Sequence, residues 1–133
     1  MFPDIEDHLK TALADTLDVT VVTSTTGGLP GEEFVKLNRT GGAQSTIVTD
    51  APVVTFECWG AADRTRTEAA EFAEAVRSAV LDLKGTQFDG APVHKVSNAD
   101  ADAGLTNDPD EDTGRHRFTF VATFVVGRTR DGS

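Results

Sequence analysis

Four acidic residues crowd one short stretch near the C-terminus, and they are the first candidates for chemistry. The segment "NDPDEDTG" carries Asp108, Asp110 and Asp112 at alternate positions. These match positions 1, 3 and 5 of an EF-hand loop, whose carboxylate oxygens bind calcium. Such a loop also needs glycine at position 6 and glutamate at position 12. Thr113 and Thr119 stand there instead, so the sequence favours a solvated loop over a calcium site.

The histidines and the single cysteine indicate no second site. His8, His94 and His116 fall on different predicted elements, and none has the spacing of a metal ligand pair. His94 and His116 could meet if their strands paired, although surface histidines are the simpler interpretation. Cys58 shares a strand face with apolar residues, which predicts a buried thiol and not a nucleophile. The sequence therefore predicts no catalytic residue, no metal and no cofactor.

Length and charge restrict the class of protein. The 133 residues favour one domain covering the whole chain, 1–133. With 22 acidic and 12 basic residues the net charge is −10, and no stretch gathers the Lys and Arg that phosphate binding needs. Specific nucleic-acid binding is therefore not expected. An apolar run of about 18 residues is also missing, so no membrane span is predicted. The acidic N-terminus is unlike a signal peptide, which favours synthesis in a cytoplasm.

Two segments have the apolar spacing of amphipathic helices. The first covers residues 3–17, where apolar side chains recur every three or four positions. The second begins after Thr65, which forms a capping-box pattern with Glu68. Its apolar stripe continues to Leu83, and Gly85 is placed to end the helix.

Strands are predicted where β-branched and aromatic residues alternate. The segments are 19–23, 34–39, 45–50, 52–60, 92–97 and 116–126. The last has the clearest alternation and is expected in the middle of the sheet. Residues 98–114 have no periodicity and are expected to form a loop. The order of elements predicts an α+β fold, with a mostly antiparallel or mixed β-sheet and two main helices packed on one face.

Trp59 and the two long loops leave two interpretations open. Trp59 shares its predicted strand face with Glu57, so a partner protein could cover it. Alternatively, Trp59 packs beneath a helix, and the loops at 24–33 and 98–114 are simply mobile.

The succession of segments resembles the tail terminator proteins of long-tailed, siphovirus-type phages, the family of the lambda tail terminator. The resemblance covers nearly the whole chain. Its parts are the short acidic N-terminal helix and then "FVKLNRTGG", "DAPVVTFECWGA", "EAAEFAEAVRSAV" and "GLTNDPDEDTGRHRFTFVATFVVG". The resemblance implies a hexameric ring that caps the tail tube, ends tail polymerisation and offers a docking surface to the head connector. It implies no catalytic residues.

Partners and contact residues follow from the same resemblance. The expected partners are other copies of the chain, the major tail tube protein and a head-completion or connector protein, with DNA free to pass through the bore of the ring. The location would be the virion, where head and tail meet. The expected interface residues are Arg39, Thr40, Gly41, Gly42, Asp108, Asp110, Asp112, Arg115 and Arg117.

An acidic loop on one subunit would face arginines on the next and orient the two. Other functions remain open. The chain could be another phage neck protein, for tail completion or head closure. From a different class, it could be a small metal-binding protein or enzyme.

Overall fold

The fold contains two helices and eight strands within the residues that the computed structural model describes, which are 4–24, 28, 30–41, 49–88, 90–98 and 105–127. The helices are α1 (Ile5–Leu17) and α2 (Arg66–Leu81). The strands are β1 (Thr20–Val22), β2 (Phe34–Gly41), β3 (Thr49–Asp50), β4 (Val53–Trp59), β5 (Gln87–Phe88), β6 (Ala91–Asn98), β7 (Thr106–Asn107) and β8 (Arg117–Gly127). Neither described helix is long and apolar enough to cross a membrane.

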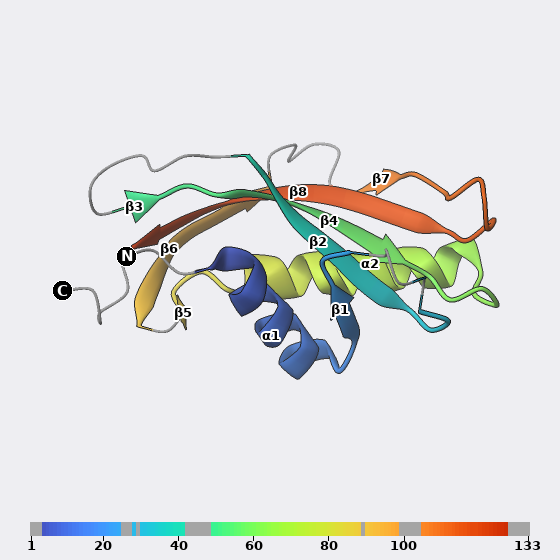
Figure 1. Cartoon of the computed structure of the whole chain (residues 1–133), viewed down its shortest axis with the longest axis horizontal. Coiled ribbons are helices and arrows are strands. Elements are labelled where there is room, and N and C mark those ends of the chain that lie inside the picture. The colour runs from blue at the N-terminus through green and yellow to red at the C-terminus, as the bar shows by residue number, and fades with distance from the viewer. Residues whose placement is uncertain are drawn as a thin grey trace.

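The strands form one curled sheet in the order β1-β2-β4-β8-β6-β5, while the short β3 and β7 also pair with β8. Among the described strand pairs, only β1 and β2 run parallel, and the others are antiparallel. The sheet curls into a half-barrel, and both helices pack against its concave side (Figure 1). The predicted α+β fold, with a mixed, mostly antiparallel sheet and two helices on one face, is confirmed.

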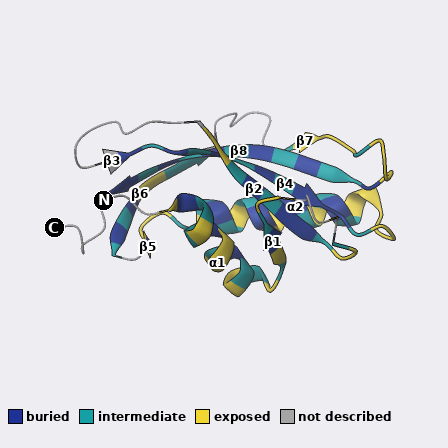
Figure 2. Cartoon of the chain, in the orientation of Figure 1, coloured by how far each residue is buried: buried dark blue, intermediate teal, exposed yellow. Residues whose placement is uncertain are grey.

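The strand with the clearest alternation, β8, occupies the predicted central position. It pairs with β4 on one side and β6 on the other. From Arg117 to Val126, half-buried odd-numbered residues alternate with buried even-numbered ones, which appears as bands along β8 (Figure 2). The even-numbered side chains belong to the core beneath the helices. Phe120 stacks on Phe56 of β4, with ring centroids 4.7 Å apart. Burial on one face thus explains the period of two in the sequence.

Small side chains bring α2 close to the sheet. Ala69 and Ala73 are fully buried, together with Val76 and Val80. A Cβ added at Gly60, just after β4, would lie 3.0 Å from the Cβ of Ala69. The Thr65 capping box is present in full. These contacts fix the start of α2 against the end of β4.

The second helix ends earlier than predicted. It stops at Leu81, and the next turn tightens because the Leu83 N–H donates to the Val80 carbonyl. Gly85 then adopts a φ of +87°, and its N–H donates to the Val93 carbonyl at 2.9 Å. The glycine therefore turns the chain onto the sheet after the helix has ended, and Leu83 still packs against the core.

Two of the strands are too short for their sequence to reveal them. β5 and β7 have two residues each; no strand was predicted at β5, and β7 lies in the segment that was expected to be loop. Of the predicted strand at 45–50, only Thr49–Asp50 lies among the described residues, where it forms β3. Within the expected loop at 98–114, Thr106 and Asn107 thus pair with β8.

Candidate functional site

The acidic segment is the turn of a hairpin that joins β7 to β8. The Asp108 N–H donates to the Arg117 carbonyl at 2.8 Å, and the Asp110 N–H donates to the Arg115 carbonyl at 3.0 Å. The Gly114 N–H closes the turn on the Asp110 carbonyl at 2.9 Å, with a φ of +73° at the glycine. This hairpin lies at one end of the sheet (Figure 1). We call residues 108–117 the acidic hairpin.

The carboxylate of Asp110 holds the turn together. It accepts hydrogen bonds from both the hydroxyl and the backbone N–H of Thr113. These bonds, with smaller contributions from the charges of Arg117 and Arg115, hold the pKa of Asp110 below its ordinary value. An Asp side chain that accepts from its own turn is a common stabiliser of tight turns. Asp110 therefore has a structural role inside its own chain.

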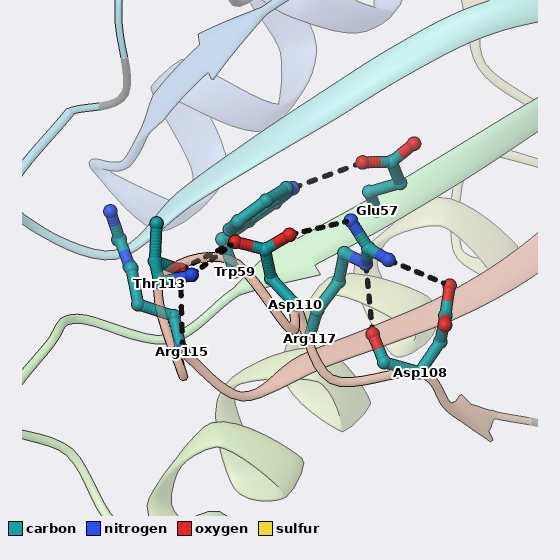
Figure 3. Close-up of polar contacts among 7 residues, drawn as sticks. All are labelled: Glu57, Trp59, Asp108, Asp110, Thr113, Arg115 and Arg117. Atoms are coloured by element: carbon teal, nitrogen blue, oxygen red, sulfur yellow. Dashed lines mark hydrogen bonds and ion pairs between the residues drawn. The ribbon is translucent and has the colours of Figure 1, made fainter.

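Arg117 connects the acidic hairpin to the outer face of the sheet (Figure 3). Its guanidinium donates to the Asp108 carbonyl at 2.8 Å and to the Asp108 carboxylate at 3.1 Å. A carboxylate oxygen of Asp110 lies 4.0 Å from the same group. The guanidinium carbon also sits 4.9 Å from the ring centroid of Trp59, a cation–π distance.

Trp59 is buried on the sheet face that points away from the helices. Only 5% of it is exposed. Its ring stacks on Phe34 at 5.3 Å, and its indole N–H donates to Glu57 at 3.1 Å. The sequence offered a partner protein or a helix as the cover for Trp59. In the structure, the arginines of the acidic hairpin cover its ring instead.

Arg115 is the most constrained charged residue of the acidic hairpin. It is 7% exposed, and its guanidinium donates to three backbone carbonyls. The acceptors are Pro30 at 2.6 Å, Glu32 at 3.0 Å and Gly60 at 2.8 Å. Its guanidinium carbon also lies 5.3 Å from the ring centroid of Phe34. One buried cation therefore joins the hairpin, the approach to β2 and the end of β4.

These contacts change which residues are free to meet a neighbouring protein. Arg115 and Arg117 bind groups of their own chain, and Asp108 and Asp110 are engaged with them or with Thr113. The remaining charged side chains of the acidic hairpin, Glu111 and Asp112, are exposed. An interface at this hairpin, which remains a prediction, would rest on those two.

The other predicted interface group lies at the far end of β4. The Arg39 guanidinium bonds to the buried carboxylate of Asp50 at 3.1 and 3.3 Å, and the Thr40 hydroxyl lies 2.9 Å from the Thr55 hydroxyl. Gly41 ends β2, and Gly42 lies outside the described residues. Since Phe34 pairs with Trp59 whereas Arg39 pairs with Val54, the two groups do not form one site.

The remaining titratable candidates stay apart. His94 lies beside Gly127, whereas His116 precedes the opposite end of β8, so the suggestion that these histidines could meet is wrong. Cys58 is fully buried, as predicted, and burial together with the charge of Glu57 raises the pKa of its thiol. Among the described residues, no group of three or more His, Cys, Asp or Glu side chains could hold a metal ion.

The aromatic and arginine cluster at Phe34, Trp59 and Arg115 was missed from the sequence. Phe34 and Trp59 meet only through the register of β2 on β4. The acceptors of Arg115 are backbone carbonyls, which leave no trace in residue type. The one available indication was the placement of Trp59 beside Glu57 on the polar face of a strand.

Replacing Arg115 by methionine should destabilise the fold strongly. The substitution Arg115→Met keeps an unbranched side chain but leaves three carbonyls without their charged donor, which should cost about 2–4 kcal/mol. Urea unfolding would measure the loss. The matched control is Arg66→Met at an exposed position of α2, expected within about 0.5 kcal/mol of wild type. Equal effects of both substitutions would contradict the role given to Arg115.

The acidic hairpin should also make stability depend on pH. Because the folded-state pKa of Asp110 is lowered, its contribution is present above the ordinary value, at about pH 4, and is lost as pH falls through the lower value. Asp110→Asn should flatten that part of the curve of Tm against pH. Asp63→Asn, at an exposed position outside the hairpin, serves as the control. If the Tm of Asp110→Asn changed with pH as steeply as that of the wild type, the pH dependence would not come from Asp110.

Comparisons with known proteins support the fold. No protein-family model and no curated protein matches the sequence. Among solved structures, a chain described as "Virion of native gene transfer agent (GTA) particle" is similar, with a TM-score of 0.61 and 16% sequence identity. The alignment covers 86% of this chain and 84% of that chain. At this identity the two chains share a fold over most of their length.

Proposed function

We propose that the chain is a structural protein of a phage or phage-like virion, and specifically a tail terminator. The observation that carries the proposal is the fold shared with a gene transfer agent virion chain over 86% of this chain. The succession of segments that resembles tail terminators points independently to the same class. In this function, a ring of subunits caps the tail tube, stops its growth and presents a surface to the head connector.

The acidic hairpin suits a contact between proteins. Its backbone bonds and the two arginines hold it in one conformation, so little conformational entropy is lost when it binds. Glu111 and Asp112 stand exposed at its tip. Exposed carboxylates on a rigid hairpin favour a basic surface on the partner, which would set orientation and association rate more than affinity.

The net charge suits a ring through which DNA passes. A chain with a net charge of −10 repels the phosphate backbone, so DNA would not adhere to the wall of the bore. The head-to-tail contacts of a cyclic assembly also return on themselves and limit its size. The proposed partners are therefore other copies of the chain, the tail tube protein and the head connector.

Light scattering coupled to size exclusion would test the proposed ring. The protein is measured over a concentration series, alone and with purified tail tube protein of the same phage. We expect a discrete ring, either free or only when tubes are present, because the tube end can template closure. A strict monomer that never associates with tubes would refute the tail terminator and favour another neck protein.

Charge reversal at the hairpin tip would test the contact that the hairpin makes. The double substitution Glu111→Lys with Asp112→Lys should weaken tube capping about tenfold or more, since it turns attraction to a basic partner into repulsion. Both side chains are exposed, and the bonds of Asp110 that hold the turn go to Thr113, so Tm should stay near the wild-type value.

The matched control reverses two exposed acids elsewhere, Asp63→Lys with Glu71→Lys. Tail lengths in electron micrographs and infectivity provide the readout. If the tip variant gave tails of normal length, the hairpin would not belong to the interface, although the proposed ring would still stand.

A further inference from the structure

We infer that the two open edges of the sheet pair with each other, head to tail, between copies of this chain. The edges are β1 and the stretch of β6 that follows Val93. This inference rests on the proposed ring and names the surfaces that would close it. It concerns the sheet edges and is independent of the acidic hairpin.

Both edges have backbone groups available for a further strand. On one side, β1 pairs only with β2 among the described residues. On the other side, β5 covers β6 at Ala91 and Pro92, and the preceding turn bonds to Val93. Beyond Val93, no strand in the described part of the chain pairs with the outer side of β6. An uncovered edge is a ready template for another strand.

The directions of the strands allow these edges to pair well. β1 is parallel to β2, β2 is antiparallel to β4, β4 to β8, and β8 to β6. Consequently β1 and β6 run in opposite directions. A second copy placed beside the first in the same orientation brings its β6 antiparallel to β1, the more stable arrangement for a ladder. The contact repeats around a ring because each copy keeps one edge free for the next.

Charge favours this pairing over a two-fold one. Asp18 and Glu32 are exposed beside β1, with Glu33 half-buried next to them. His94 and Lys95 are exposed on β6. A head-to-tail contact brings the acidic edge to the basic one. Pairing β1 with β1 across a two-fold axis would instead place carboxylates opposite each other, which is unfavourable.

A hollow beside β1 fits an apolar side chain of the incoming strand. It has a volume of about 350 Å³ and is lined by Leu17, Val19 and Phe72 along with the acidic residues of that edge. The hollow opens along the edge of β1, with α2 on its helix side and Thr20 and Glu32, joined by a hydrogen bond of 3.0 Å, also in its wall. Val96 pairs with the buried Phe124 and therefore points to the helix side of β6. Val96 is half-buried against the core of its own copy, and in the extended sheet its exposed part would face the helix side of the hollow.

Cysteine cross-linking would test the arrangement. Thr20 and Lys95 both point to the face opposite the helices, since Thr20 alternates with the buried Val21 and Lys95 pairs with the half-exposed Val125. The double variant Thr20→Cys with Lys95→Cys, treated with a short bis-maleimide, should give a ladder of multimers that ends at the closed ring. Either single variant should give no ladder.

Three controls accompany the ladder. The wild-type protein should not react, because Cys58 is fully buried. Cysteines at two exposed helix positions, Thr11→Cys with Glu71→Cys, should give no ladder. Strong dimers from Thr20→Cys alone would show a two-fold contact and overturn the inference.

Charge exchange tests the same contact without cysteines. Lys95→Glu and Glu32→Lys should each weaken self-association about tenfold, and the double variant should restore it, because the opposite charges are then exchanged. Unchanged Tm values would show that the subunits remain folded. If all variants form rings as the wild type does, the edges are not the interface and only the proposed function survives. If the wild type never associates, even with tubes, both proposals fall.

Discussion

The buried guanidinium of Arg115 is the constraint on which one whole end of the molecule depends. A charge taken out of water must be fully hydrogen-bonded, and here the donors meet the carbonyls of Pro30, Glu32 and Gly60. Those acceptors come from the approach to β2 and the end of β4, so the acidic hairpin cannot shift without breaking all of these bonds. Because Gly60 also touches the start of α2 through Ala69, the same cation helps to fix the helix layer.

The charged residues divide into those that bind groups of their own chain and those that are exposed to a neighbouring protein. The arginines near the hairpin neutralise acceptors of their own chain, as Arg39 neutralises Asp50 at the other end of the sheet. The exposed surface keeps the excess of carboxylates that the net charge of −10 requires. Free subunits, each strongly negative, therefore repel one another. Association has to use backbone edges, or carboxylates that meet a basic partner, which is a physical reason for specificity.

Patterns that arise because one face of an element is buried can be predicted from the sequence. Contacts that arise from the register of paired strands cannot. Alternation in β8 and the stripe of α2 are visible because one side of each faces the core. The cluster at Trp59 depends instead on the β2–β4 register, and its central cation binds carbonyls that any residue could supply. The early end of α2 was missed because Leu83 continues the stripe by packing from a turn. The acidic segment looked mobile since its order comes from local bonds, such as those of Asp110.

The short length of the edge strand β1 affects how a ring could form. β1 has three residues, so one edge contact supplies few backbone hydrogen bonds and would be weak alone. Short strands of this kind protect a free subunit from uncontrolled aggregation, yet they still orient a neighbour that is already nearby. In a closed ring, the last contact forms within one assembly, where the effective concentration is high. A tube end that binds several subunits at once has the same effect. Weak edges would therefore assemble at the end of a tube and stay apart elsewhere, which is the behaviour that a tail terminator requires.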